Sequence, residues 1–144
     1  MTLADLNRHL ALRDKIEKTQ ETLDSIRSAA QLRAAKLTGM PRAPGVSDKV
    51  GDLAIEIADL STSLDALNAE LLRQEREIVE FISGIEDNQT RIIFRLRFLR
   101  GLSWKEVSQV LGRYTSENSV KAVCYRFFRE EIDAGVDVDA INDV

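Results

Sequence analysis

"RIIFRLRFLRGLSWKEVSQVLG", residues 91–112, decides how the second half of this chain folds. It contains two short amphipathic segments, and Gly101 separates them. Glycine readily adopts the left-handed conformation that ends a helix. Ser103, with Glu106 three residues later, fits a capping box, in which each side chain accepts a hydrogen bond from the other residue's backbone N–H. The sequence therefore predicts one helix that ends at Arg100 and a second that starts at Ser103.

A third helix is predicted to follow, starting near Ser116 after Gly112 and the turn "RYT". Upstream, Asp87 or Asn88 is expected to cap the first of the three helices. Their apolar side chains are expected to form one core: Ile92, Ile93, Leu96, Leu99, Trp104, Val107, Val110, Leu111, Val120, Val123, Cys124, Phe127 and Phe128. Three helices of this size, with a turn before the last, have the dimensions of a helix-turn-helix.

The first half of the chain predicts an antiparallel helical hairpin. Side chains from Ile16 to Leu37 follow alternating spacings of three and four, which place them on one stripe of a helix. Both prolines then fall within residues 38–46, a segment that no helix crosses. A more regular seam follows, typical of a coiled coil: Val50, Leu53, Ile57, Leu60, Leu64, Leu67, Leu71, Gln74, Ile78, Phe81 and Ile85. This seam is expected to pack against the first helix, a second copy of the chain, or both.

These patterns predict an all-α chain in three parts. Residues 1–86 form the hairpin, which serves in dimerisation or docking, residues 87–131 form the helix-turn-helix, and residues 132–144 form an acidic tail. A homo-oligomer is expected, with a dimer as the first hypothesis. Gln74 is the single polar residue of the seam, and it either sets the register or oligomeric state or reaches solvent.

Charge is distributed unevenly along a chain whose net charge is -4. Residues 1–87 carry 11 basic and 16 acidic side chains, residues 88–129 carry 9 and 2, and residues 130–144 carry 0 and 6. A basic segment between two acidic ones predicts an anionic partner for one face of the molecule. The acidic C-terminal residues are expected to be solvated, with mimicry of DNA as the alternative.

The residues that the sequence lacks exclude several classes of protein. A single cysteine, Cys124, cannot form an internal disulfide, and a single histidine, His9, leaves no set of zinc ligands. We expect Cys124 to be a small buried hydrophobe and His9 to be an ordinary surface residue. Without a phosphate-binding loop, an activated nucleophile or a metal-binding spacing, neither enzymatic activity nor a cofactor is expected. Without a long apolar run or a signal sequence, a cytoplasmic protein with no membrane partner is expected.

The third helix, over about residues 116–129, is expected to enter the major groove of double-stranded DNA. The candidates for reading bases are Glu117, Asn118, Ser119, Lys121, Ala122, Tyr125 and Arg126. Basic side chains and the N–H groups at helix N-termini suit backbone phosphates. The candidates for phosphate contacts are Arg100, Ser103, Lys105, Arg113, Thr115, Ser116 and Arg129.

At these residues the sequence resembles the region 4 helix-turn-helix of bacterial sigma factors. The likeness is carried by "LRFLRGLSWKEVSQVLG" and "SENSVKAVCYRFFRE" and covers residues 88–130. Together with the hairpin, it makes the chain similar to small phage and prophage regulators, the ArpU-like and related families. The resemblance implies a sequence-specific DNA-binding transcriptional regulator of phage genes that works in the cytoplasm of a bacterial host, with host RNA polymerase as a further partner.

The sequence departs from the sigma pattern in two places. Three residues separate Gly112 from Ser116 where the sigma pattern usually has one, so the third helix is re-aimed or starts earlier, at Thr115. The promoter-melting region 2 is missing, which favours a repressor, an activator or a polymerase-tethering protein. Two alternatives stay open: a phage DNA-packaging component of the small-terminase type, and an adaptor that binds RNA polymerase through the hairpin without touching DNA.

Overall fold

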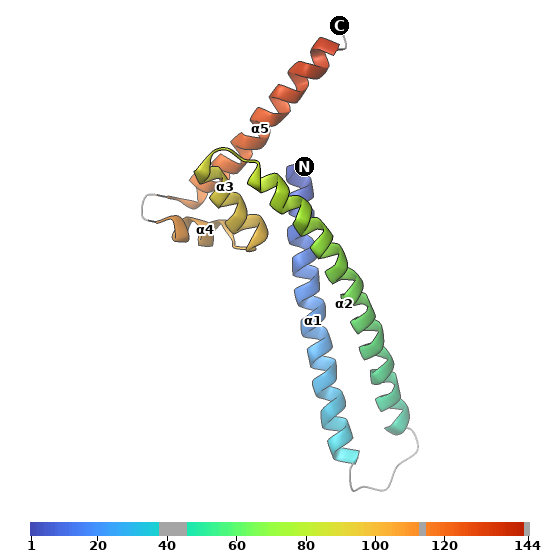
Figure 1. Ribbon diagram of the computed structural model, residues 1–144. Coiled ribbons are helices and arrows are strands. Elements are labelled where there is room, and N and C mark those ends of the chain that lie inside the picture. The colour runs from blue at the N-terminus through green and yellow to red at the C-terminus, as the bar shows by residue number, and fades with distance from the viewer. Residues whose placement is uncertain (38–45, 113–114, 143–144) are drawn as a thin grey trace. The chain divides into compact units, whose positions relative to one another are not determined.

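The computed structural model in Figure 1 describes residues 1–37, 46–112 and 115–142. Side chains are described for residues 1–35, 51–112 and 115–130. The regular structure in these ranges is helical, so the chain is all-α, as the sequence predicts. The helices are α1 (Leu3–Leu37), α2 (Val46–Ser83), α3 (Asn88–Phe94), the π-helical turn η1 (Arg95–Leu99), α4 (Trp104–Leu111) and α5 (Glu117–Asn142). Apart from Val46, which opens α2, the predicted connection at 38–46 lies outside the described residues.

The chain divides into two compact units, and the division differs from the predicted boundary at residue 86. We call Met1–Leu10 together with Gln74–Val144 the core unit, and Ala11–Arg73 the paired-helix unit. The first turns of α1 and the last turns of α2 belong to the core unit because their apolar side chains enter the same core as those of the short helices.

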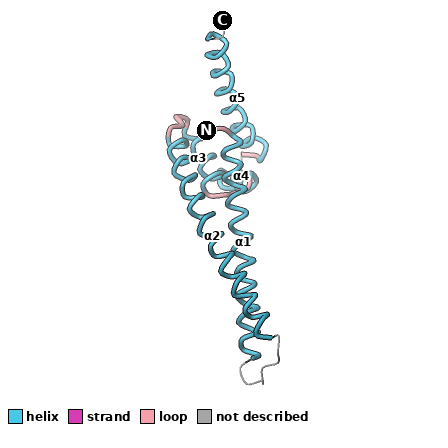
Figure 2. Tube along the Cα trace, turned by 90° about the vertical axis from the view of Figure 1, so that its right-hand side faces the viewer, coloured by secondary structure: helices cyan, strands magenta, loops and turns pink. Residues whose placement is uncertain are grey.

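In the paired-helix unit, α1 and α2 lie side by side and run in opposite directions (Figures 1 and 2). Arg27 of α1 donates a hydrogen bond from Nη2 to Oγ of Ser61 on α2, at 3.4 Å. Leu23 and Leu64 are buried, with 2% and 4% of their surface exposed. Five other seam residues of this unit are half-buried: Leu53, Ile57, Leu60, Leu67 and Leu71. A helix with one neighbour leaves the flanks of its apolar stripe in water, which accounts for the partial burial.

The two ends of the predicted seam are not part of the half-buried stripe described above. The side chain of Val50 is outside the described residues. Ile78 is buried in the core unit, together with Ile82, which follows it by one turn of α2. Ile85 is also buried there, although α2 has already ended at Ser83. The last part of the seam therefore packs against the short helices and contributes to a different core.

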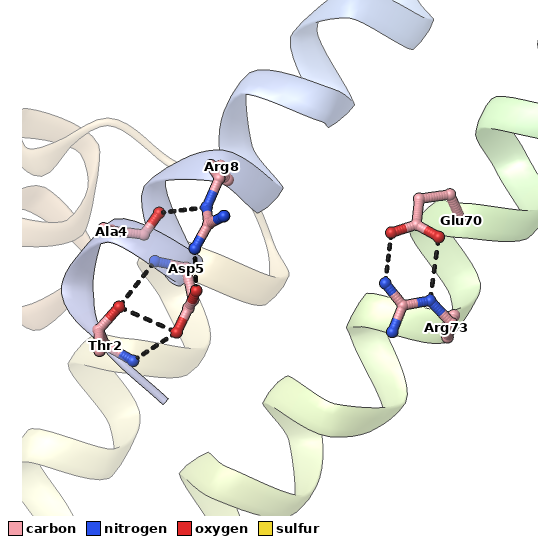
Figure 3. A network of polar contacts seen from close by, with 6 residues as sticks. All are labelled: Thr2, Ala4, Asp5, Arg8, Glu70 and Arg73. Carbon is pink, nitrogen blue, oxygen red and sulfur yellow. Dashed lines mark hydrogen bonds and ion pairs between the residues drawn. The ribbon is translucent and has the colours of Figure 1, made fainter.

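The start of α1 is fixed by a reciprocal cap, drawn in Figure 3. The backbone N–H of Thr2 donates to the carboxylate of Asp5 at 2.8 Å, and the N–H of Asp5 donates to the Thr2 hydroxyl oxygen at 3.2 Å. The hydrogen bonds from Thr2 lower the pKa of Asp5. Arg8 adds an ion pair with Asp5. Figure 3 also shows the ion pair of Glu70 with Arg73, which lies within α2.

His9 is fully buried, so the prediction that it lies on the surface is wrong. It follows Leu6 by three residues and therefore falls on the same apolar stripe of α1. Its Nδ1 lies 3.1 Å from Oε1 of Gln74, within hydrogen-bond distance. Gln74 is half-buried, and its amide faces the imidazole as well as solvent.

Phenylalanine rings from three elements form the centre of the core unit. The Phe94 ring of α3 lies 5.1 Å from Phe127 and 5.6 Å from Phe128 of α5, and 5.6 Å from Phe98 of η1. Around this cluster the buried apolar side chains are Leu6, Ile78, Ile82, Ile85, Ile93, Val107, Val120 and Cys124. Edge-to-face and offset ring pairs stabilise a core beyond the area that they bury.

Four residues between 88 and 130 are buried or exposed against the prediction. Ile92 and Val110 are exposed, at 43% and 61%, whereas Phe94 and Phe98 are fully buried and were absent from the predicted set. On α3 the buried stripe runs through Thr90, Ile93 and Phe94, so Ile92 points away from it. Phe98 follows Phe94 by four residues, about one helical turn, and lies on the same face. On α4 the buried residues are Val107 and Ser108, and Val110 lies on the outer face.

Several predicted helix boundaries are confirmed. Asp87 caps α3, and its carboxylate accepts from the N–H of Thr90 at 2.9 Å. Ser103 and Glu106 form the predicted capping box at the start of α4. Gly101 has a φ of 71°, and the following N–H, that of Leu102, donates to the Leu96 carbonyl at 3.1 Å. These contacts join residues close in sequence, which is why the sequence alone predicts them.

The backbone of α5 continues to Asn142. Residues 132–142, predicted as part of a separate acidic tail, are therefore helical and continuous with the third helix. Helix α5 starts at Glu117, one residue after the predicted start of the third helix.

Candidate nucleic-acid interface

The predicted DNA-binding surface lies on α4, α5 and the turn between them. Gly112, with a φ of 107°, ends α4, and its carbonyl accepts from the N–H of Thr115 at 3.2 Å. The next residue, Ser116, forms a reciprocal pair with Ser119. Each serine hydroxyl accepts from the other's backbone N–H, at 3.1 Å and 3.0 Å. A cap of this kind fixes where α5 starts, and so fixes which side chains face outward.

Helix α5 has one face in the core and one face in solvent. Val120, Cys124 and Phe128 are buried at intervals of four residues. The other face carries most of the predicted base readers. Glu117, Asn118, Ala122, Tyr125 and Arg126 are exposed, and Lys121 is half-buried. We call these six residues the outer face of α5.

Two of the predicted base readers already have partners within α5. The hydroxyl of Ser119 accepts from the Ser116 N–H and donates to the Ser116 carbonyl at 2.8 Å. Nζ of Lys121 lies 3.2 Å from the carboxylate of Glu117, one turn earlier. Exposed ion pairs at this spacing contribute only about a few tenths of a kcal/mol to stability. A phosphate can therefore replace Glu117 as the partner of Lys121. Ser119 therefore acts first in the cap of α5, while Lys121 remains available to an anion.

The predicted phosphate contacts are similarly mixed. Arg100, Lys105 and Arg129 are exposed. Both polar groups of Ser103 are used in its capping box with Glu106, and Thr115 is half-buried. Arg113 lies outside the described residues. The exposed basic side chains of the set are thus available to bind phosphate, whereas Ser103 and Ser116 cap the N-termini of α4 and α5.

Some of the arginines in the basic segment are structural. Arg97 donates from Nη1 to the Leu102 carbonyl at 2.9 Å, and its guanidinium carbon lies 4.9 Å from the centre of the Trp104 ring. Burial lowers the pKa of this arginine. Arg91 donates to the Ile85 carbonyl at 2.8 Å. These contacts brace η1 and the start of α3, so neither charge is fully available to an external anion.

Arg95 was missed as a candidate. It is exposed, and it joins the other exposed basic side chains of the described part of residues 88–129. These are Arg95, Arg100, Lys105, Arg126 and Arg129. Sequence spacing held a usable signal, because Arg95 lies off the stripe of Thr90, Phe94 and Phe98, which recurs every four residues.

Cys124 lies in the core and is fully buried, as predicted. Burial raises the pKa of its thiol to about 12, so the thiolate needed for metal binding or nucleophilic attack does not form at neutral pH. Among the described residues, no group of histidine, cysteine and carboxylate side chains is arranged to hold a metal ion. In the same residues, no helix combines the length and apolarity needed to cross a bilayer.

No model of a protein family, no curated protein and no solved structure matches this chain. Its function is therefore inferred from its own residues.

Proposed function

We propose that this chain is a sequence-specific DNA-binding regulator of transcription, built as a helical hairpin joined to a helix-turn-helix like region 4 of sigma factors. In this proposal α4 and α5 are the two helices of the motif, and α5 is the recognition helix. Double-stranded DNA is the partner of the outer face of α5.

The observation that carries the proposal is the division of α5 into a buried face and a polar outer face. Val120, Cys124 and Phe128 anchor the helix to the core. Lys121, Tyr125 and Arg126 then project on the other side, with Tyr125 48% exposed. A recognition helix needs this combination, because rigid anchoring determines which side chains reach the base edges.

The exposed arginines and lysine supply the second requirement, affinity for phosphate. Arg100 ends η1, Lys105 lies in the first turn of α4, and Arg129 lies on α5. Neutralising phosphates releases counterions, so binding through these groups falls steeply with salt. The sequence likeness to sigma region 4, which spans the same helices, supports transcription as the process and RNA polymerase as a second partner. Phage or prophage genes are the proposed targets on the same ground.

The proposed assembly is a dimer formed through the long helices. Their half-buried seam would gain from a second copy, because Leu53, Ile57 and Leu60 keep part of their apolar surface in water. A two-fold dimer predicts DNA half-sites separated by whole helical turns. A ring-sized assembly in solution would favour the DNA-packaging alternative instead.

Fluorescence anisotropy with random-sequence duplex DNA over a salt series tests the proposal. We expect affinity of about micromolar Kd at low salt that weakens steeply as salt rises. The double variant Lys121→Ala/Arg126→Ala should bind more weakly, with a shallower dependence on salt, by about one in slope for each phosphate that is no longer neutralised. Lys15→Ala/Arg33→Ala is the matched control, since it removes two exposed positive charges from α1.

Equal losses of affinity in the two double variants would mean that net charge alone governs binding, and the assignment of α5 would fail. A folded protein with no DNA binding even at low salt would make the motif a protein-docking module.

A further inference from the structure

The core unit contains a groove that shares only Arg126 with the residues of the DNA-binding proposal. It is lined by residues from the end of α2, the start of α3 and α5, and has a volume of about 840 Å³. All of its lining residues belong to the core unit. Its size is within the range of sites that hold several side chains of a ligand. We call it the acidic groove, for the charges described below.

The floor of the acidic groove is apolar. Phe81 of α2 and Phe127 of α5 line it, with ring centres 6.1 Å apart in an edge-to-face arrangement. Ile85 and Val123 extend the apolar lining. Both phenylalanines and Val123 are only half-buried, whereas Phe94, Phe98 and Phe128 are buried. Apolar surface therefore remains in contact with water at a place where a further apolar side chain could cover it.

The rim of the groove is negatively charged. Among the described residues, its carboxylates are those of Glu80, Glu86, Asp87 and Glu130, and its basic group is Arg126. All four acidic residues are exposed. Hydrogen bonds from Thr90 lower the pKa of Asp87 from its ordinary value of 3.8. The rim thus carries an excess of negative charge, in contrast to the basic segment that contains α3 and α4.

We propose that the acidic groove docks a basic amphipathic segment of another protein, with apolar side chains on the Phe81–Phe127 floor and lysine or arginine side chains against the rim. Charge complementarity selects this occupant. DNA would bring phosphates against four carboxylates, which is unfavourable. A second copy of the chain has a net charge of -4 but a basic segment at residues 88–129, so the solution mass measured below distinguishes that occupant.

Gly84 offers a way to fill the groove without disturbing the core. It lines the groove, and a Cβ at this position would come no closer than 3.4 Å to its nearest neighbour, the Phe81 carbonyl oxygen. That distance is an ordinary contact, and the φ of Gly84 is not in the left-handed region. Gly84→Leu should therefore fold normally while its side chain occupies the site. Gly51→Leu is the matched control, because a Cβ there meets nothing within 4 Å.

The probe is a fluorescein-labelled synthetic peptide of about four helical turns, with leucine on one face and lysine on the other. A second peptide, with glutamate in place of lysine, controls for apolar adhesion. Anisotropy is measured with the full chain. We expect the lysine peptide to bind the wild type and the Gly51→Leu control equally. Gly84→Leu should bind it at least about tenfold more weakly, and the glutamate peptide should not bind.

Charge reversal on the rim tests the electrostatic half of the proposal. Glu80→Lys/Glu130→Lys should lose the lysine peptide and gain the glutamate peptide. Glu17→Lys/Glu21→Lys makes the same change in net charge at exposed positions of α1. Equal loss of binding in the two double variants would overturn the proposal, because the peptide would then respond only to overall charge. Circular dichroism and Trp104 fluorescence show whether each variant is folded.

Two other results would also overturn it. Unchanged peptide binding in a folded Gly84→Leu variant would mean that the peptide binds elsewhere. A lower solution mass in Gly84→Leu than in the wild type would mean that a second copy of the chain occupies the groove. Gly84→Leu should bind DNA as the wild type does, because that change removes no charge.

Discussion

The core unit and the paired-helix unit are built from the same two long helices, yet they differ in how those helices are buried. In the core unit, apolar side chains from α1, α2 and the short helices converge, and Phe94 and Phe98 are completely enclosed. In the described part of the paired-helix unit, Leu23 and Leu64 are the buried apolar residues, and the rest of the seam is half-buried. Burial from several directions removes more apolar surface than burial from one.

A continuous helix need not have the same stability along its whole length. Each long helix has one end in a core with many neighbours and the remainder in a pair. Local opening costs least where it exposes little buried apolar surface. We therefore expect the paired-helix unit to open more readily than the core unit, so that the two units exchange amide hydrogens at different rates.

Phe94→Ala should have the largest effect. The ring contacts Phe98, Phe127 and Phe128, and no part of it reaches solvent. Removing a fully buried phenylalanine costs about 3–5 kcal/mol. Because the single tryptophan, Trp104, lies in this unit, urea unfolding followed by its fluorescence measures the decrease in stability. An unchanged midpoint would mean that the phenylalanine cluster does not hold the core unit together.

Leu64→Asp should break the other unit. It places a carboxylate at a buried seam position, so the cost should exceed the roughly 2–3 kcal/mol of a mild Leu→Ala change. Helicity by circular dichroism should fall, while the Trp104 signal of the core unit survives. If helicity, solution mass and melting all stay the same, the seam does not join the helices.

Leu6 and Leu23 form a matched pair, with one buried leucine in each unit. Both are buried leucines of α1, but Leu6 belongs to the core unit and Leu23 to the paired-helix unit. Leu6→Ala should lower the stability reported by Trp104 by about 2–4 kcal/mol. Leu23→Ala should leave that transition nearly unchanged and instead speed amide exchange in residues 11–35. Equal shifts in the Trp104 transition would mean that the two units unfold as one.

Labelling of Cys124 should report the smallest effect on the free energy of unfolding, and it measures directly how often the core unit opens. Its pKa is raised to about 12 by burial, against 9.0 for the ordinary thiol. At pH 8 a thiol reagent should therefore modify Cys124 only when the core unit opens. The stability from keeping the thiol neutral is fully present below pH 9.0 and is lost as the pH rises toward 12. Rapid labelling of the native protein would contradict this assignment.

The candidate interface was only partly predictable from the sequence. The amphipathic pattern of α5 correctly separates Val120, Cys124 and Phe128 from the outer face. The same pattern gave no sign that the Ser119 hydroxyl is used in a cap, since serine suits both caps and base contacts. Nor did a count of positive charge show that Arg97 stacks on Trp104, because that contact depends on where two helices meet.

The sequence by itself determined the all-α class, a helix cap at Asp87 or Asn88, the capping box at Ser103 and the helix end at Gly101. Each depends on residues within one or two turns of each other, so the residues that interact can be identified from the local sequence. The tertiary structure alone decided that His9 is buried against Gln74 and that the first ten residues join the core unit. It also decided that a carboxylate-rimmed groove forms between α2, α3 and α5. These features require partners far apart in the chain, whose meeting is fixed by the packing of whole helices.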